Sequence, residues 1–178
     1  MLGDADKLVR FNAALALADV AAPRHAAAFV QALADEHNDI VLTAFQALSR
    51  LKPRDLSRHV LAFIGNKKRW AKVPPHQRDL VVRFLKGSLN QKKVLALLRR
   101  ITLDGIAAAR RKEKPSYAME VMEAACLLAE AGDATGAPVL RHALSGGEYA
   151  QERALRALAL LKDTSAVPLI IAKPLENP

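Results

Sequence analysis

The stretch Asp133–Leu140, reading DATGAPVL, returns 30 residues later as Asp163–Ile170, reading DTSAVPLI. Aspartate, a hydroxyl-bearing residue and proline keep their positions in both copies. Self-similarity at a period of about 30 residues, in a chain rich in Ala and Leu, is typical of solenoids built from helix pairs. The repeat therefore predicts an all-α fold, an α-solenoid of antiparallel helix pairs.

The start of the chain holds a second repeat, with a period of 31 residues. Its matching positions are Leu2 and Leu33, Asp4 and Asp35, Val9 and Ile40, Ala13 and Ala44, and Leu17 and Leu48. Apolar residues at helical spacing predict helices within 1–64 that start near Asp6 or Asp4, Pro23, Asn38 or Asp39, and Pro53. In the first of these helices we expect one buried face, formed by Leu8, Phe11, Leu15 and Ala18.

The duplicated stretch also predicts how two helices begin. Thr135 and Ser165 are each placed to cap a helix N-terminus with the side-chain hydroxyl. Pro138 and Pro168 then fall in the first helical turn, where the N–H that proline lacks would have no helical partner.

The helical pattern is interrupted in the middle of the chain. Gly65–Pro75, reading GNKKRWAKVPP, has no helical periodicity and is predicted to be an extended loop. Helices are expected near 76–86, 91–101, 103–111, 116–131, 136–144, 148–161 and 166–172. We interpret 1–178 as a single helical-repeat domain, regular in 1–64 and 115–178 and irregular in 65–114. It is either a piece of a longer array or an array finished by atypical end helices.

Two phrases of the sequence combine the end of one repeat with the start of the next. They are Val9-Arg10 with Ala13-Ala14, Leu17, Pro23 and Phe29-Val30, and Glu152–Leu158 with Asp163 and Val167-Pro168. These phrases resemble HEAT repeats of the bacterial type found in phycobilisome lyases. The resemblance does not extend to 65–114, where the turn aspartate and the alanine pair are missing. It implies the architecture and leaves the function open, because such repeats serve many functions.

The net charge of +9 is concentrated in one segment. Residues 65–114 hold 15 Lys and Arg against 3 Asp and Glu, whereas 1–64 is neutral and 115–178 has a net charge of −3. An electrostatic interaction with a partner is therefore expected to involve 65–114.

Within this segment, the predicted helix 91–101 separates apolar from basic side chains. Val94, Leu97, Leu98 and Ile101 fall on one face, and Lys92, Lys93, Arg99 and Arg100 fall on the opposite face. The basic face is either a solvated surface of a basic protein or a binding surface for an anionic partner.

Two further basic clusters flank this helix. The first consists of Lys67, Lys68, Arg69, Trp70 and Lys72, and the second of Arg110, Arg111, Lys112 and Lys114. An aromatic ring among cations suits single-stranded nucleic acid or a phosphorylated partner, although a Trp in a loop also commonly packs onto adjacent helices. The second cluster is either a solvated linker or part of the same binding surface.

Signals for catalysis, metal binding and cofactors are weak. The five histidines are at least 12 residues apart, so none forms a helical metal-binding pair, and we predict no metal and no cofactor. Cys126 is interpreted as a packed core thiol, and Glu120, Glu123 and Glu130 as a solvated face. No apolar run reaches the length of a membrane span, and Asp4, Asp6 and Lys7 interrupt any signal peptide, which favours a cytoplasmic location without membrane contact.

These observations predict a non-enzymatic scaffold whose surface binds another protein, one with an acidic surface. The alternative is binding of DNA or RNA through 65–114. Enzymes with similar repeats, such as glycosylases that act on alkylated DNA bases, resemble the chain only in architecture.

Overall fold

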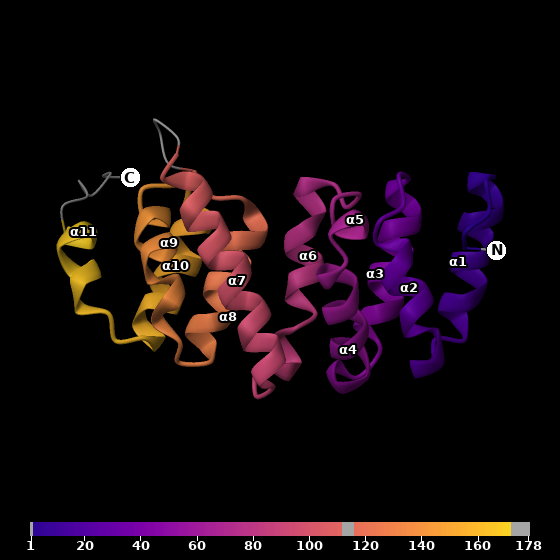
Figure 1. Ribbon diagram of the computed structural model, residues 1–178, viewed down its shortest axis with the longest axis horizontal. Coiled ribbons are helices and arrows are strands. Elements are labelled where there is room, and N and C mark those ends of the chain that lie inside the picture. Colours follow the sequence, from indigo (N-terminus) through magenta and orange to yellow (C-terminus); the bar gives the residue numbers. More distant parts are fainter. Residues whose placement is uncertain (1, 112–115, 172–178) are drawn as a thin grey trace. The chain divides into compact units, whose positions relative to one another are not determined.

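The computed structural model describes residues 2–111 and 116–171, including all their side chains except those of 53–55 and 170. In this part of the chain every regular element is a helix, which confirms the all-α prediction (Figure 1). Contacts divide the chain into two compact units, Met1–Val94 (unit 1) and Leu95–Pro178 (unit 2). The boundary between the two units falls inside 65–114. The interpretation of 1–178 as a single domain stays a prediction. None of the described helices combines the length and apolar character needed to cross a membrane.

Alternate helices of unit 1 pack against each other. Helix α1 (Lys7–Asp19) packs on α3 (Asn38–Ser49), and α2 (Ala26–Ala32) packs on both α3 and α4 (Pro53–Gly65). The remaining elements are the short helices α5 (Lys67–Trp70) and α6 (Arg78–Arg83) and the 3-10 turns η1 (Pro23–His25), η2 (Pro75–Gln77) and η3 (Lys86–Ser88). Asp6 caps α1 through a hydrogen bond from the Leu8 N–H, as predicted for one of two candidates.

The buried face of α1 differs from the predicted one. Leu8 and Leu15 are 61% and 43% exposed, whereas Ala13 and Ala14 are buried. The face of α1 that packs on α3 is the one with the two alanines, because small side chains let the helices approach closely. Leu8 and Leu15 lie on another face and are exposed to solvent. The stripe prediction is therefore wrong for its two leucines.

A buried arginine takes part in the same packing. The guanidinium of Arg10 donates to Asp35 at 2.8 Å and to the carbonyl oxygens of Asp4 and Ala5 at 2.9 Å. Asp35 also accepts the N–H of His37 at 3.0 Å, so α3 begins without a cap from Asn38 or Asp39. Burial opposes ionisation of Asp35, but the hydrogen bonds from Arg10 and His37 outweigh it and lower the pKa of that carboxyl.

Unit 2 holds most of α7 (Lys92–Ala109), and its described residues after α7 form four further α-helices and two 3-10 turns. The α-helices are α8 (Met119–Glu130), α9 (Ala137–Ala143), α10 (Glu148–Leu160) and α11 (Val167–Ile171), and the turns are η4 (Ala134–Gly136) and η5 (Thr164–Ala166). Helix α8 packs on both α9 and α10. Their core includes Ala125, Val139, Leu140, Ala154 and Leu158, all buried.

Helix α7 (Lys92–Ala109) is continuous where two helices were predicted. The predicted break fell at Thr102, between 91–101 and 103–111, and α7 runs through this position. A Cβ at Gly105 would lie 2.6 Å from a methyl carbon of Val121, so this glycine permits close contact between α7 and α8. It serves packing rather than helix termination.

The duplicated turn has the same backbone in both copies. Gly132 and Lys162, at equivalent positions, both have a positive φ, 75° and 53°. The N–H groups of the following Asp133 and Asp163 bond back to carbonyls five residues earlier, at 2.9 and 3.1 Å. This pattern ends a helix with a left-handed residue, so the two copies of the sequence form the same turn.

The caps after this turn are the aspartates, not the hydroxyl residues. Asp133 accepts the N–H and the hydroxyl of Thr135 at 2.9 and 2.6 Å, and Asp163 accepts the same groups of Ser165 at 3.0 and 2.5 Å. The prediction that Thr135 and Ser165 supply the caps is wrong, because each hydroxyl donates to the neighbouring carboxylate. Pro138 lies at the start of α9, as predicted.

Candidate partner-binding surface

The segment after α4 forms a short helix, so the prediction of an extended loop over Gly65–Pro75 is wrong. Asn66 ends α4 in an extended conformation, and its side-chain oxygen accepts the N–H of Arg69 at 3.2 Å. This cap allows Lys67–Trp70 to form α5, a single helical turn. The basic residues of the segment are thus held on a helical turn.

The cations of α5 and its C-terminal end face solvent. Lys67, Lys68, Arg69 and Lys72 are all exposed. Among the described residues, none of their side chains has an ion-pair or hydrogen-bond partner. Four like charges within six residues create a local positive potential that attracts anions.

Trp70 is partly buried within unit 1, and another side chain covers one face of its ring. Its ring is half-buried, and the Arg78 guanidinium lies over it at 5.4 Å from the ring centroid. Arg78 is held in turn by the carbonyl oxygen of Val73 at 3.0 Å. A nucleic-acid base would have to displace this cation to stack on the same face, so the packed interpretation of Trp70 fits better.

The predicted division of α7 into two faces is confirmed for most positions. Val94, Leu97 and Leu98 are buried, and Ile101 is half-buried. Lys92, Lys93, Arg99 and Arg100 are exposed. In the described part of the chain, Lys92, Lys93 and Arg100 have no ion-pair partner.

Arg99 differs from its basic neighbours. Its Nε lies 2.5 Å from the Asp133 carboxylate, with the side chains 51% and 11% exposed. Burial opposes ionisation of Asp133, but hydrogen bonds from Thr135 and Arg99 outweigh it and lower the pKa of the carboxyl. Arg99 therefore supports the turn before α9, and its charge is partly neutralised.

The third basic cluster is only partly described. Arg110 and Arg111 follow the end of α7 and are exposed. Lys112 and Lys114 lie outside the described residues. Arg110 and Arg111 belong to unit 2, whereas Lys67–Lys72, Lys92 and Lys93 belong to unit 1.

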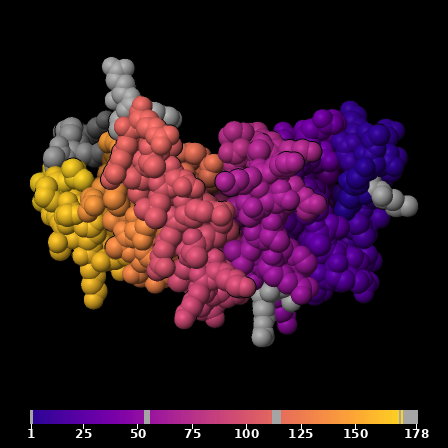
Figure 2. All heavy atoms as spheres, in the orientation of Figure 1, coloured from indigo at the N-terminus to yellow at the C-terminus, as the bar shows by residue number. Residues whose placement is uncertain are grey.

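Most of the net charge belongs to unit 1. Unit 1 holds 16 basic and 8 acidic residues, a net charge of +8, whereas unit 2 holds 11 and 10, a net charge of +1. Within unit 1, residues 65–94 account for nine basic residues and one acidic residue. In Figure 2 this segment, coloured from magenta to rose, forms much of the face of unit 1 that the view shows.

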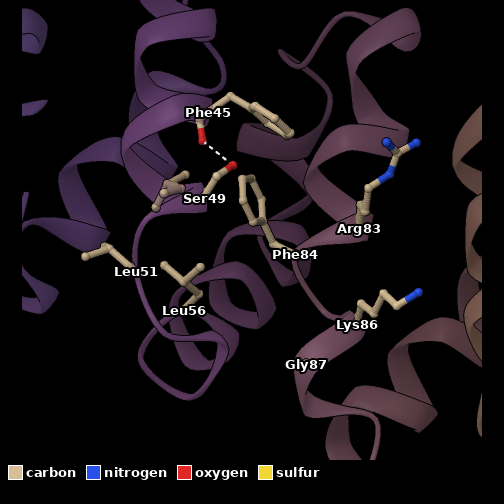
Figure 3. A pocket seen from close by; sticks show the side chains of 9 residues that line it. Phe45, Ser49, Leu51, Leu56, Arg83, Phe84, Lys86 and Gly87 are labelled. Atoms are coloured by element: carbon tan, nitrogen blue, oxygen red, sulfur yellow. Dashed lines mark hydrogen bonds between the residues drawn. The ribbon is translucent and has the colours of Figure 1, made fainter.

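Helix α6 contacts the basic turn α5 at its start and an apolar pocket at its end. Arg78 at its start lies over Trp70 of α5, and Phe84, just after its end, contacts Phe45 of α3 with ring centroids 5.0 Å apart. A pocket of about 370 Å³ opens beside these two rings (Figure 3). It is lined by Phe45, Leu48, Ser49, Leu51, Leu56, Arg83, Phe84, Lys86 and Gly87.

Figure 3 shows how the lining side chains are divided. Phe45 and Phe84 lie together, with Leu51 and Leu56 on one side of them. Arg83 and Lys86 extend from the opposite side, with their charged ends directed away from the rings. The pocket therefore combines an apolar interior with cations at one edge. Its residues come from three separate stretches of chain, and no local pattern in the sequence marks any of them as a site.

Cys126 and two glutamates of α8 lie in the interior of unit 2. Burial raises the pKa of the Cys126 thiol to about 11, which disfavours the nucleophilic thiolate and agrees with a core thiol. Glu120 and Glu123 are 8% and 2% exposed, so their interpretation as a solvated face is wrong. Glu123 pairs with Arg153 of α10 at 2.5 Å, which explains how a carboxylate is accommodated there. Residues 2–111 and 116–171 contain no group of three or more His, Cys, Asp or Glu that could hold a metal ion.

No protein-family model matches the chain, and searches of curated proteins and of solved structures find no match.

Proposed function

We propose that the chain is a non-enzymatic scaffold, an α-solenoid of antiparallel helix pairs with HEAT-like repeats, that binds a protein with an acidic surface. The binding surface is the basic segment 65–94 of unit 1. The cytoplasmic location predicted from the sequence belongs to the same proposal.

The contacts between alternate helices support the solenoid. Arg10 of α1 reaches the aspartate that precedes α3, Arg99 of α7 reaches the one before α9, and Arg141 of α9 reaches the one before α11. In each case an arginine is held by the turn that opens the second helix after its own. In a solenoid of helix pairs, the first helices of successive repeats lie side by side, and so do the second helices. Such a stack produces this contact once in each repeat.

One observation carries the functional proposal: the exposed cations of 65–94 without described acidic partners. Lys67, Lys68, Lys92 and Lys93 are in this group. Cations that stabilise a fold are normally paired, as Arg10 and Arg99 are. Unpaired ones destabilise slightly through mutual repulsion, and complementary charge on a partner would relieve this and accelerate association.

Nucleic acid is the second candidate, because four exposed cations gather around α5. Two observations place it second. Trp70 is covered by Arg78 on one face, which removes a stacking platform. The accessible pocket beside Phe45 and Phe84 offers apolar contact that a phosphate backbone would not use.

Fluorescence anisotropy with labelled probes tests the proposal. The probes are a DNA and an RNA oligonucleotide and an acidic peptide of similar net charge, at 50 and 200 mM salt. Binding to nucleic acid through six or more phosphates would weaken roughly a thousandfold between these salt concentrations. We expect the parent to bind the acidic peptide and to show only weak, sequence-independent affinity for the oligonucleotides.

Two charge-reversal variants locate the binding surface. Lys67→Glu with Lys68→Glu changes the first turn of α5, where acidic residues suit the helix dipole. Arg110→Glu with Arg111→Glu makes the same change in net charge in unit 2 and serves as the control. The first variant should lose at least about tenfold in affinity for the peptide and the second much less. A parent that prefers nucleic acid supports the second candidate, and one that binds no probe at 50 mM salt overturns both.

A further inference from the structure

The pocket between α3, α4 and the end of α6 has the features of a side-chain recognition site. Its volume of about 370 Å³ falls within the range of ligand pockets, and its interior is formed largely by leucine and phenylalanine. Phe45 and Phe84 are each half-buried, so part of both rings faces the pocket and solvent. An apolar group placed there would complete the burial of both rings.

The charge around the pocket restricts what can enter it. Arg83 and Lys86 line one edge, and Arg83 also lies 3.6 Å from Asp79. Lys92 and Lys93 follow Gln91, whose side chain donates to Ser57, next to the pocket residue Leu56. The edge of the pocket formed by Arg83 and Lys86 is therefore basic, and an apolar group attached to anionic neighbours fits better than one attached to cations.

We infer that this pocket receives one large apolar side chain, Phe or Leu, from an acidic segment of the partner protein. The acidic residues beside it face Arg83, Lys86, Lys92 and Lys93. This inference rests on the proposed function and adds to it: the basic surface attracts an acidic segment, and the pocket selects the segment with an apolar residue in register. Apolar anchors that fill a pocket commonly dominate such interfaces.

Ser49 allows the pocket to be filled without disturbing the core. It lines the pocket, is exposed, and its hydroxyl bonds only to the carbonyl oxygen of Phe45 at 2.8 Å in the described structure. In Ser49→Phe the new ring would occupy the pocket. Gln46→Phe places the same ring at an exposed position of α3 that does not line the pocket, and is the matched control. Circular dichroism and thermal melting check that both variants fold like the parent.

The probes are fluorescein-labelled peptides with five glutamates on each side of a central residue, either Phe or Ala. With the full chain at 50 mM salt, the Phe peptide should bind about tenfold tighter than the Ala peptide. Ser49→Phe should reduce this ratio to near one while leaving the Ala peptide unaffected, and Gln46→Phe should preserve it. Lys92→Glu with Lys93→Glu should weaken both peptides alike.

The outcomes separate the pocket from the surface. If the parent binds both peptides equally with steep salt dependence, the pocket inference fails and the proposed function stands. If the ratio persists in Ser49→Phe, the apolar residue binds elsewhere and the inference also fails. If neither peptide binds, the proposed function itself fails. Amide chemical shifts supply an independent measurement. Both peptides should shift Arg83 and Lys86, whereas the Phe peptide should shift the interior residues Phe45, Leu48 and Leu56 more strongly than the Ala peptide does.

Discussion

The turn before α9 yields a sharp prediction, because its cap depends on one carboxylate. Asp133 accepts two hydrogen bonds from Thr135 and forms an ion pair with Arg99. Asp133→Ala removes all three interactions at once. The N–H of Thr135 then loses its acceptor, and the guanidinium of Arg99 loses its partner.

The expected cost follows from these contacts. Loss of an N-cap costs about 1 kcal/mol in free energy of unfolding. The ion pair adds about 0.5 kcal/mol, because Arg99 is 51% exposed and solvent screens the attraction. Asp133→Ala should therefore lower the free energy of unfolding by about 1.5 kcal/mol.

Two further substitutions separate the contributions, measured by urea denaturation at pH 7. Asp133→Asn keeps an acceptor for the Thr135 N–H but removes the charge, so it should cost about 0.5 kcal/mol. Thr135→Ala removes only a hydroxyl that donates to Asp133, and it should cost about 0.5 kcal/mol or less.

The pH dependence provides a second readout. The folded pKa of Asp133 is lowered, so the stability due to its charge is fully present above the pKa of the unfolded chain, about 4. It is lost as the pH falls through the folded pKa. The advantage of the parent over Asp133→Asn should thus be constant from pH 7 to 5 and should shrink toward pH 2.

Two results would refute this account of the turn. If Thr135→Ala costs as much as Asp133→Ala, the hydroxyl is the cap and the assignment to Asp133 is incorrect. If Asp133→Asn and the parent keep the same difference in stability down to pH 2, the charge of Asp133 is not stabilised by Arg99 and the hydrogen bonds of the turn.

Other predictions concern stability and reactivity in unit 2. Lys162→Gly should stabilise the fold by about 0.5 to 1 kcal/mol, since Lys162 has φ 53°, while Gly132→Ala should cost about 1 kcal/mol; both are read from urea midpoints. Gly136→Ala should cost at least about 2 kcal/mol, because its Cβ would lie 2.7 Å from the Cα of Ala125; parental stability would show that α8 shifts freely. Cys126 should react slowly with a thiol reagent at pH 8 and rapidly in denaturant, and equal rates would contradict its burial.

The repeat could be predicted because its signal is local. Asp, a hydroxyl residue and Pro recur within one turn, and both copies have the same backbone hydrogen bonds. The identity of the cap could not be predicted in the same way. Asp133 and Thr135 are both good cap residues, and only the three-dimensional geometry shows which one accepts the backbone N–H.

Features that depend on packing were harder to predict. The first helix contains Leu8 and Leu15 on one face and Ala13 and Ala14 near another, and helical spacing alone favoured the leucines. The buried face of α1 depends on its contact with α3, which packs against the two alanines. The pocket is formed by stretches around Phe45, Leu56 and Phe84, which no local pattern links. Trp70 and the basic residues could be identified in the sequence. The contact between the Arg78 guanidinium and the Trp70 ring could not, because it depends on how α6 packs beside α5.

The cations of this chain fall into two groups, those paired with carboxylates and those without a partner in the described residues. Arg10, Arg99 and Arg141 are held by aspartates at the turns, as suits a planar guanidinium that makes several directed hydrogen bonds. The exposed cations of 65–94 that have no partner among the described residues are Lys67, Lys68, Arg69, Lys72, Lys92 and Lys93. Most of them are lysines, which are flexible, strongly hydrated point charges. Such a surface accelerates association with acidic partners but discriminates poorly among them. Discrimination would therefore require a contact with defined shape, and we propose the pocket beside Phe45 and Phe84 as that contact. It follows that salt should change how fast a partner binds, whereas filling the pocket should change which partner remains bound.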